Sequence, residues 1–296
     1  MSILSLLLPD FLLILLGVVL FRRVDLGAGF WPGLEKLVYF VLFPALLFYA
    51  TSRTPFDFSH SGRLLATALI ATGAGILLGW LGKPLFAVEP MRFESAVQTA
   101  FRFNSYIALA IASRIGGEAG TALVALVIGF AVPICNMAAV HALARGKGGL
   151  GLALVKNPLL MATLAGVAGN LLGLHLPEVL NATLSRLGNA SIALGLITVG
   201  AGLRLRAAHG AHHLAAYFIV VKLLALPAIG YGVGRYLQLP PQHLQLVVMF
   251  CALPTASSAY VLAARMGGDG PFVAFVVSAG TVLSALTLPF WLLLVS

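Results

Sequence analysis

IASRIGGE, at residues 111–118, recurs as LAARMGGD at residues 262–269. The two copies lie 151 residues apart, as Arg114 and Arg265 do, and this offset is close to half of the 296-residue chain. Each copy closes an apolar segment that also holds polar and helix-breaking residues, RFNS at 102–105 and LPTASS at 253–258. Interrupted hydrophobic segments at matching positions of two halves are typical of the midplane binding site of a secondary transporter.

The composition predicts an integral membrane protein. Hydrophobic residues make up 60% of the chain and charged residues only 9%, whereas soluble domains carry about 25% charged residues. The net charge of +9 comes from single or paired cations at segment ends and not from basic runs with interleaved aromatic residues, which argues against a nucleic-acid partner. Cys135 and Cys251 lie inside apolar segments and form no metal-ligand pattern. We expect neither a metal nor a cofactor.

Apolar windows of about twenty residues predict ten membrane-spanning helices. The first is interpreted as a retained span, because the start of the chain lacks the basic region and cleavage site of a signal peptide. The longest polar interval falls between segments five and six, so we expect a first five-helix half at 1–145, an inner linker at 146–156 and a second half at 157–296. The expected segments are 3–21, 36–51, 64–82, 94–114, 119–143, 153–174, 185–203, 212–235, 243–265 and 270–295.

The distribution of Lys and Arg predicts the orientation of these segments. With the N-terminus outside, the inner loops carry eleven Lys and Arg residues and the outer loops carry five, as the positive-inside rule requires. Both termini are therefore expected outside. Because each half has an odd number of spans, the second half must be inverted relative to the first.

Several short motifs follow one another along the whole chain. They are PDF at 9–11, FPALLF at 43–48, RFN at 102–104, KNPL at 156–159 and PTA at 254–256. In their order and spacing they resemble the auxin efflux carrier family, whose bacterial members include transporters of dicarboxylates such as malate and malonate. Plant members carry a long hydrophilic loop between helices five and six. This chain has only a short interval there, so neither auxin as substrate nor loop phosphorylation is carried over.

The resemblance implies an all-α membrane fold of two inverted five-helix repeats. In such a fold helices four and nine are broken and cross near the midplane, as in bile-acid symporters and sodium/proton antiporters. The resemblance also implies elevator-type alternating access between a scaffold and a mobile crossover domain, which are interleaved across both repeats. A bacterial member of the family would lie in the inner membrane.

The polar residues at the two breaks are the candidate substrate ligands. A broken helix exposes N–H groups and a positive dipole end, which bind anions, and the Asn104 amide can donate to a carboxylate. The Arg102 guanidinium matches a carboxylate, but residues two apart share a cavity only where the helix is broken between them. Phe103, Asn104 and Pro254 mark the expected breaks. The further candidate ligands are Ser105, Thr255, Ser257 and Ser258.

Each of these residues has a structural alternative. Asn104 is then only a cap that bonds a neighbouring helix, and Arg102 pairs with a carboxylate or with backbone carbonyls at a domain interface. The small residues after Pro254 then only permit close packing of helices. Pro254 itself is then a kink in a continuous helix.

Besides Arg102, two charged residues lie well inside apolar segments. Asp10 is either a protonatable carboxylate that couples transport to protons or a structural residue, which lies at the outer interface or caps a helix. Lys222 is interpreted as a snorkelling or scaffold residue rather than a substrate ligand.

We expect a secondary transporter or uniporter of small organic anions, with mono- or dicarboxylates as substrates and the lipid bilayer as its surroundings. The chain has no GxxxxGK[ST] phosphate loop, and it has no HExxH or GxSxG motif, so neither an ATP-driven pump nor an enzyme is expected. A cation-coupled symporter or antiporter of the related fold and a non-transporting membrane receptor remain as alternatives. Proton or sodium coupling and the oligomeric state, for which a homodimer is one alternative, stay open.

Overall fold

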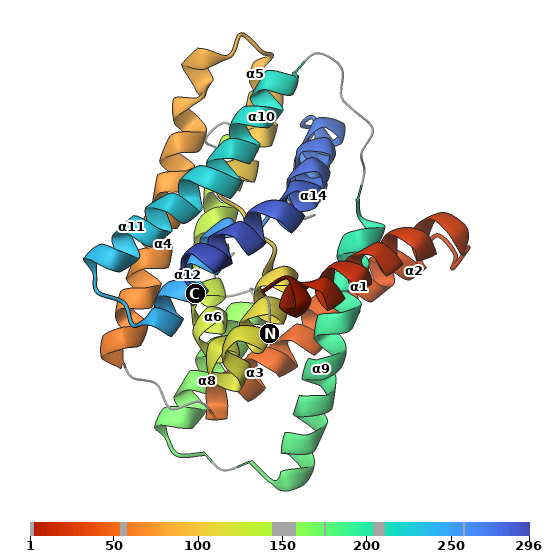
Figure 1. The fold of residues 1–296 in the computed structure, drawn as a ribbon. Coiled ribbons are helices and arrows are strands. Elements are labelled where there is room, and N and C mark those ends of the chain that lie inside the picture. Colours follow the sequence, from red (N-terminus) through yellow and green to blue (C-terminus); the bar gives the residue numbers. More distant parts are fainter. Residues whose placement is uncertain (1–2, 54–57, 144–157, 175, 204–210, 257) are drawn as a thin grey trace. The chain divides into compact units, whose positions relative to one another are not determined.

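The computed structural model describes residues 3–53, 58–143, 158–174, 176–203, 211–256 and 258–296, and every element in these ranges is helical (Figure 1). Six helical runs within these ranges are long and apolar enough to cross a bilayer. The prediction of an all-helical protein that spans the membrane several times is therefore confirmed, whereas ten spans in two inverted repeats stay a prediction. The six runs are Phe30–Arg53, Ser61–Leu85, Pro90–Leu143, Glu178–Ala201, His212–Tyr236 and Gly270–Leu294.

The chain divides into two compact units, each made of several separate segments. The first unit contains Met1–Phe58, Tyr106–Phe130 and Gly151–Gly202. The second contains Ser59–Ser105, Ala131–Leu150 and Leu203–Ser296. The expected linker at 146–156 lies outside the residues that the structure describes.

In the first unit, long helices pack through small residues. Helix α1 packs against α9, and α3 packs against both α8 and α9. A Cβ added at Gly17 would overlap the Ile197 carbonyl, and one added at Gly200 would overlap the Ile14 carbonyl, so glycine permits the close approach of α1 and α9. A π-helical turn, Val38–Leu42, joins α2 to α3. The helices are α1 (Ile3–Arg23), α2 (Phe30–Leu37), α3 (Phe43–Arg53), α8 (Pro158–Leu171) and α9 (Glu178–Ala201).

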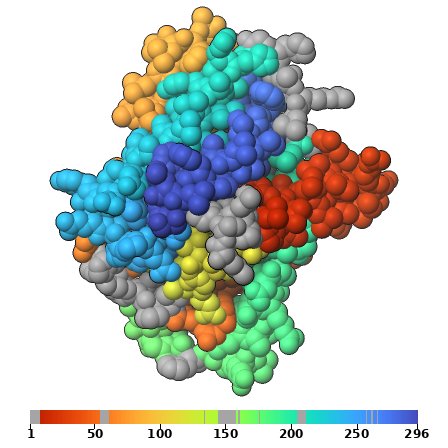
Figure 2. All heavy atoms as spheres, in the orientation of Figure 1, coloured from red at the N-terminus to blue at the C-terminus, as the bar shows by residue number. Residues whose placement is uncertain are grey.

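The second unit has an aromatic core. The rings of Phe93 and Phe218 lie 5.6 Å apart, and both side chains are buried. Helix α14 packs against α5, α10, α12 and α13, and Figure 2 shows α10 (cyan) and α14 (blue) in direct contact. The helices are α4 (Phe58–Leu81), α5 (Pro90–Ala96), α10 (His212–Val220), α11 (Leu226–Tyr236), α12 (Pro241–Ala252), α13 (Ser258–Arg265) and α14 (Gly270–Leu294).

Helix α6 (Ser105–Leu143) contributes residues to both units. The run from Pro90 to Leu143 has 54 residues, which at about 1.5 Å per residue is more than twice the thickness of a bilayer core. It is interrupted by a non-helical stretch at 101–104 and by Gly117, which has a φ of 58°. In the second copy of the repeated stretch Gly267 also has a positive φ, 75°. Each copy therefore turns the chain at a glycine.

A second π-helical turn, Val221–Ala225, joins α10 to α11. It precedes Pro227, which has no N–H to donate to the Leu223 carbonyl four residues earlier. The Trp291 indole Nε1 of α14 donates to that carbonyl instead, at 2.9 Å. The freed backbone group is thus satisfied inside the protein, as a membrane environment demands.

Large apolar side chains are exposed on many helices. Leu172, Val179 and Leu286 are among the most exposed of these residues. A soluble protein rarely exposes so many large apolar side chains, whereas lipid solvates them. The surface therefore agrees with the composition, and both indicate a protein embedded in a bilayer.

Candidate functional site

The first predicted break is present in the second unit. Helix α5 tightens into a 3₁₀ turn at Val97–Ala100, and α6 begins only at Ser105. Residues 101–104 are not helical. The break therefore separates Arg102 from the helical register of α6, which is the condition under which Arg102 and Asn104 can face one site.

The second predicted break lies between α12 and α13. Helix α12 ends at Ala252, and Leu253 is extended, with a φ of −61° and a ψ of 142°. Pro254 follows and cannot donate a backbone hydrogen bond. Pro254 thus lies in a true interruption of the helix and not in a simple kink.

The two breaks are hydrogen-bonded to each other. The Asn104 backbone N–H donates to the Pro254 carbonyl at 2.8 Å, and the Thr255 hydroxyl donates to the Thr99 carbonyl at 2.7 Å. Each bond uses a backbone group that an uninterrupted helix would have paired internally. We call these two breaks and the bonds between them the crossover.

Charged and polar side chains also meet at the crossover. The Arg102 Nη2 atom donates to the Ser258 hydroxyl at 3.0 Å, and Nη1 donates to the Gln98 side-chain oxygen at 3.4 Å. Arg102 thus reaches from the first break to the start of α13. The ring of Phe103 packs edge-on against Phe250, with centroids 4.5 Å apart.

The candidate ligands differ in their exposure. Asn104 is 3% exposed and Thr255 is 5% exposed, Pro254 and Phe103 are buried, and Ser258 is exposed. Arg102 and Ser105 are partly exposed. Ser257 lies outside the residues that the structure describes. The structure brings the other candidates together in one unit, whereas their role as substrate ligands stays a prediction.

Asp10 lies in the first unit and is not part of the crossover. Its carboxylate accepts two hydrogen bonds from Arg114, one from Nε at 2.9 Å and one from Nη2 at 2.8 Å. The Asp10 side chain is buried, whereas Arg114 is more than one third exposed. Arg114 belongs to the first copy of the repeated stretch, a partner that the sequence analysis did not find.

Of the two interpretations of Lys222, snorkelling and scaffold residue, the structure contradicts the first. Lys222 lies in the π-helical turn Val221–Ala225, is only 4% exposed, and donates from Nζ to the Cys251 carbonyl at 3.1 Å. Its ammonium group therefore does not snorkel toward the membrane surface. Its position in the middle of an apolar segment was the signal in the sequence that pointed to a role inside the protein. An ionisable residue within a membrane segment is by default a candidate functional residue.

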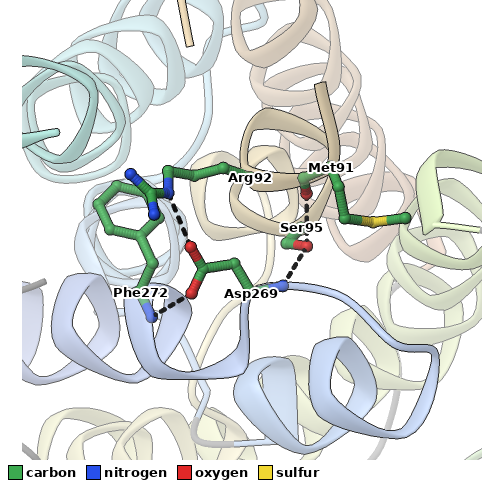
Figure 3. A network of polar contacts seen from close by, with 5 residues as sticks. All are labelled: Met91, Arg92, Ser95, Asp269 and Phe272. Atoms are coloured by element: carbon green, nitrogen blue, oxygen red, sulfur yellow. Dashed lines mark hydrogen bonds and ion pairs between the residues drawn. The ribbon is translucent and has the colours of Figure 1, made fainter. Parts of the chain in front are cut away.

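Asp269, in the second copy of the repeated stretch, organises the start of α14 (Figure 3). Its carboxylate accepts from the Phe272 backbone N–H at 3.0 Å and from Arg92 Nε at 2.7 Å. Its own backbone N–H donates to the Ser95 hydroxyl at 2.9 Å, and that hydroxyl donates to the Met91 carbonyl. Asp269 is thus a helix cap that ties α14 to α5.

Comparison with known proteins identifies relatives of this chain. A family described as "Membrane transport protein" matches residues 147–292. A "Putative malonate transporter" of Rhizobium meliloti (strain 1021) is 27% identical over 305 residues, which cover 97% of this chain and 93% of that protein. The "Uncharacterized transporter YfdV" of Escherichia coli (strain K12) is 26% identical over 276 residues, which cover 88% of this chain and 87% of that protein.

These relatives agree with the resemblance in the sequence and with the helical, membrane-spanning structure. Residues 147–292 match the membrane transport protein family of the auxin efflux carriers, and the protein is a multi-pass membrane transport protein, not an enzyme.

Proposed function

We propose that the protein is a secondary transporter of small organic anions, with mono- and dicarboxylates as its substrates. The observation that carries this proposal is the crossover, where two broken helices bond to each other and present Arg102 and Asn104. The name of the Rhizobium relative, a malonate transporter, supports the same substrate class.

The charge at the crossover supports an anion. Arg102 brings a positively charged guanidinium to the crossover, where it donates to two neutral side chains, Gln98 and Ser258. Helices α6 and α13 both begin at the crossover, and helix N-termini carry partial positive charge. A carboxylate that leaves water would find its replacement donors there, among them the Asn104 amide and the hydroxyls of Ser105 and Ser258.

The division into two units supports an elevator mechanism. Each unit combines segments from both halves of the chain, as interleaved scaffold and transport domains require. The crossover lies entirely within the second unit, so we propose that this unit carries the substrate and that the first is the scaffold. We propose further that both termini face the outside of a bacterial inner membrane and that Asp10 couples transport to protons.

The experiment that tests the substrate site uses Asn104→Ala. This change removes the side-chain amide and leaves the backbone bond to Pro254 intact. We expect it to weaken malonate binding to the purified protein by about 1–3 kcal/mol and to slow malonate uptake into proteoliposomes.

The matched control is Asn189→Ala, which changes an exposed asparagine of α9 in the first unit. It should bind malonate as the wild type does. If Asn104→Ala also binds malonate with wild-type affinity, the crossover is an architectural break and the substrate site lies elsewhere.

A further inference from the structure

Lys222 lines a small cavity that adjoins the crossover. The cavity measures about 10 Å³, which is about the volume that one water molecule needs. Thr99 of the 3₁₀ turn before the first break lines it, together with Pro254 and Thr255 of the second break and Lys222. The remaining lining residues are Phe218, Ile219, Leu223, Val276 and Gly280. A dicarboxylate does not fit in this space, so the cavity is not the substrate site proposed above.

The polar groups around this cavity are mainly hydrogen-bond acceptors. The Thr99 hydroxyl donates its proton to the Ala96 carbonyl, and the Thr255 hydroxyl donates its proton to the Thr99 carbonyl. Each hydroxyl oxygen then has only lone pairs left to offer. An oxygen-lined space of this kind favours a cation and not an anion.

The Lys222 ammonium is the cation whose side chain lines this cavity. Its Nζ donates to the Cys251 carbonyl, which an unbroken α12 would have paired with the N–H of residue 255. None of the ion pairs between described side chains includes Lys222. Burying a cation without a carboxylate partner costs free energy, so we expect Lys222 to have a functional role.

In transporters with broken helices, the carbonyl oxygens of the unwound backbone and the C-terminal ends of half-helices coordinate Na⁺. The end of α12 is such a place in this protein. We propose that the Lys222 ammonium is a tethered cation that stands where a coupling sodium ion would bind, and that it holds the C-terminal end of α12 against the crossover. The proposal rests on the crossover being the transport site.

The test compares unfolding temperatures of purified protein in NaCl and in choline chloride at equal ionic strength. The wild type should unfold at the same temperature in both salts. Lys222→Ala removes the tethered cation and leaves room for a free one, so it should unfold several degrees lower in choline chloride and regain part of this loss in NaCl, with saturation. Lys36→Ala, at an exposed lysine of α2, is the matched control and should show neither effect.

A second variant keeps the test decisive if Lys222→Ala cannot be purified. Lys222→Met keeps the length of the side chain and removes only the charge, so it should be destabilised in both salts. The proposal would be overturned if Lys222→Met were as stable as the wild type. It would also be overturned if Lys222→Ala unfolded at the same temperature in NaCl and in choline chloride. These measurements need no substrate, so failure to bind malonate would count against the proposed function and not against the tethered cation.

Discussion

At the scale of single residues, the Thr255 hydroxyl joins the two breaks through its bond to the Thr99 carbonyl. Thr255→Val keeps the shape of the side chain and removes the donor, so a buried carbonyl loses this partner. We expect a loss of about 1–3 kcal/mol in the free energy of unfolding. We also expect weaker malonate binding, though less weakened than in Asn104→Ala. Chemical unfolding and ligand titration of the same purified variant measure both effects, and an unchanged unfolding midpoint would show that the bond contributes nothing.

Asp10 and Arg114 form the clearest ion pair of the first unit. Asp10→Asn leaves the guanidinium without its counter-charge and should lower the free energy of unfolding by about 1.5–3 kcal/mol. The double variant with Arg114→Gln should lose less than the sum of the two single changes, because the pair acts as one. Additive losses in this cycle would mean that the two residues are not coupled.

The proposed coupling of transport to protons makes a separate prediction for the same residue. An amide does not titrate in the physiological range, so malonate flux through Asp10→Asn should no longer change with pH. Proteoliposome uptake across a series of pH values measures this. A pH profile like that of the wild type would leave Asp10 with a structural role alone.

Single residues show where sequence reasoning succeeds and where it stops. The sequence indicated that Arg102 and Asn104 share a site only if the helix breaks between them, and the structure contains that break. It did not identify the setting of Lys222, because lipid and the protein interior are both apolar. The apolar pattern around a residue therefore does not tell which of the two surrounds it. Arg114 was missed as the partner of Asp10 because 104 residues separate them.

At the scale of elements, the packing of α1 on α9 depends on Gly17 and Gly200. Gly200→Ala places a methyl group on the Ile14 carbonyl, and backbone on both sides must move. We expect a destabilisation of about 1–3 kcal/mol, as for other overpacked positions. Gly73→Ala, in α4 with no atom near the added Cβ, is the control and should be neutral or stabilising. Equal thermal stability of the two variants would refute close packing of α1 and α9.

The broken helices were predictable as elements, but their bonds to each other were not. Pro254 and the polar stretch at 102–105 interrupt apolar segments, and that pattern located both breaks. The 3₁₀ turn before the first break and the π-helical turn around Lys222 left no comparable pattern. In these turns, backbone groups form hydrogen bonds with residues elsewhere in the unit. The Leu223 carbonyl, for example, accepts a hydrogen bond from Trp291. Such contacts depend on residues that are distant in the sequence, so the local sequence does not predict them.

At the scale of the whole molecule, the predicted inverted repeat determines on which side of the membrane each loop is expected. Ten spans place residue 146 inside and the C-terminal Ser296 outside. Cysteines introduced at Gly146 and Ser296 should therefore react with an impermeant thiol reagent from opposite faces of the membrane. The native thiols of Cys135 and Cys251 are buried and should give little background. Reaction of both introduced cysteines from the same face would contradict the predicted topology of two inverted repeats.

The intrinsic fluorescence of the Trp291 indole can report structural changes in the second unit. Trp291 is 8% exposed and bonds the carbonyl of Leu223, beside Lys222. Indole fluorescence shifts to longer wavelengths when water replaces such surroundings. The chain has two other tryptophans, Trp31 and Trp80. Once these are replaced by phenylalanine, the emission spectrum of the remaining indole can follow the π-helical turn during a transport cycle, in real time and without an attached dye.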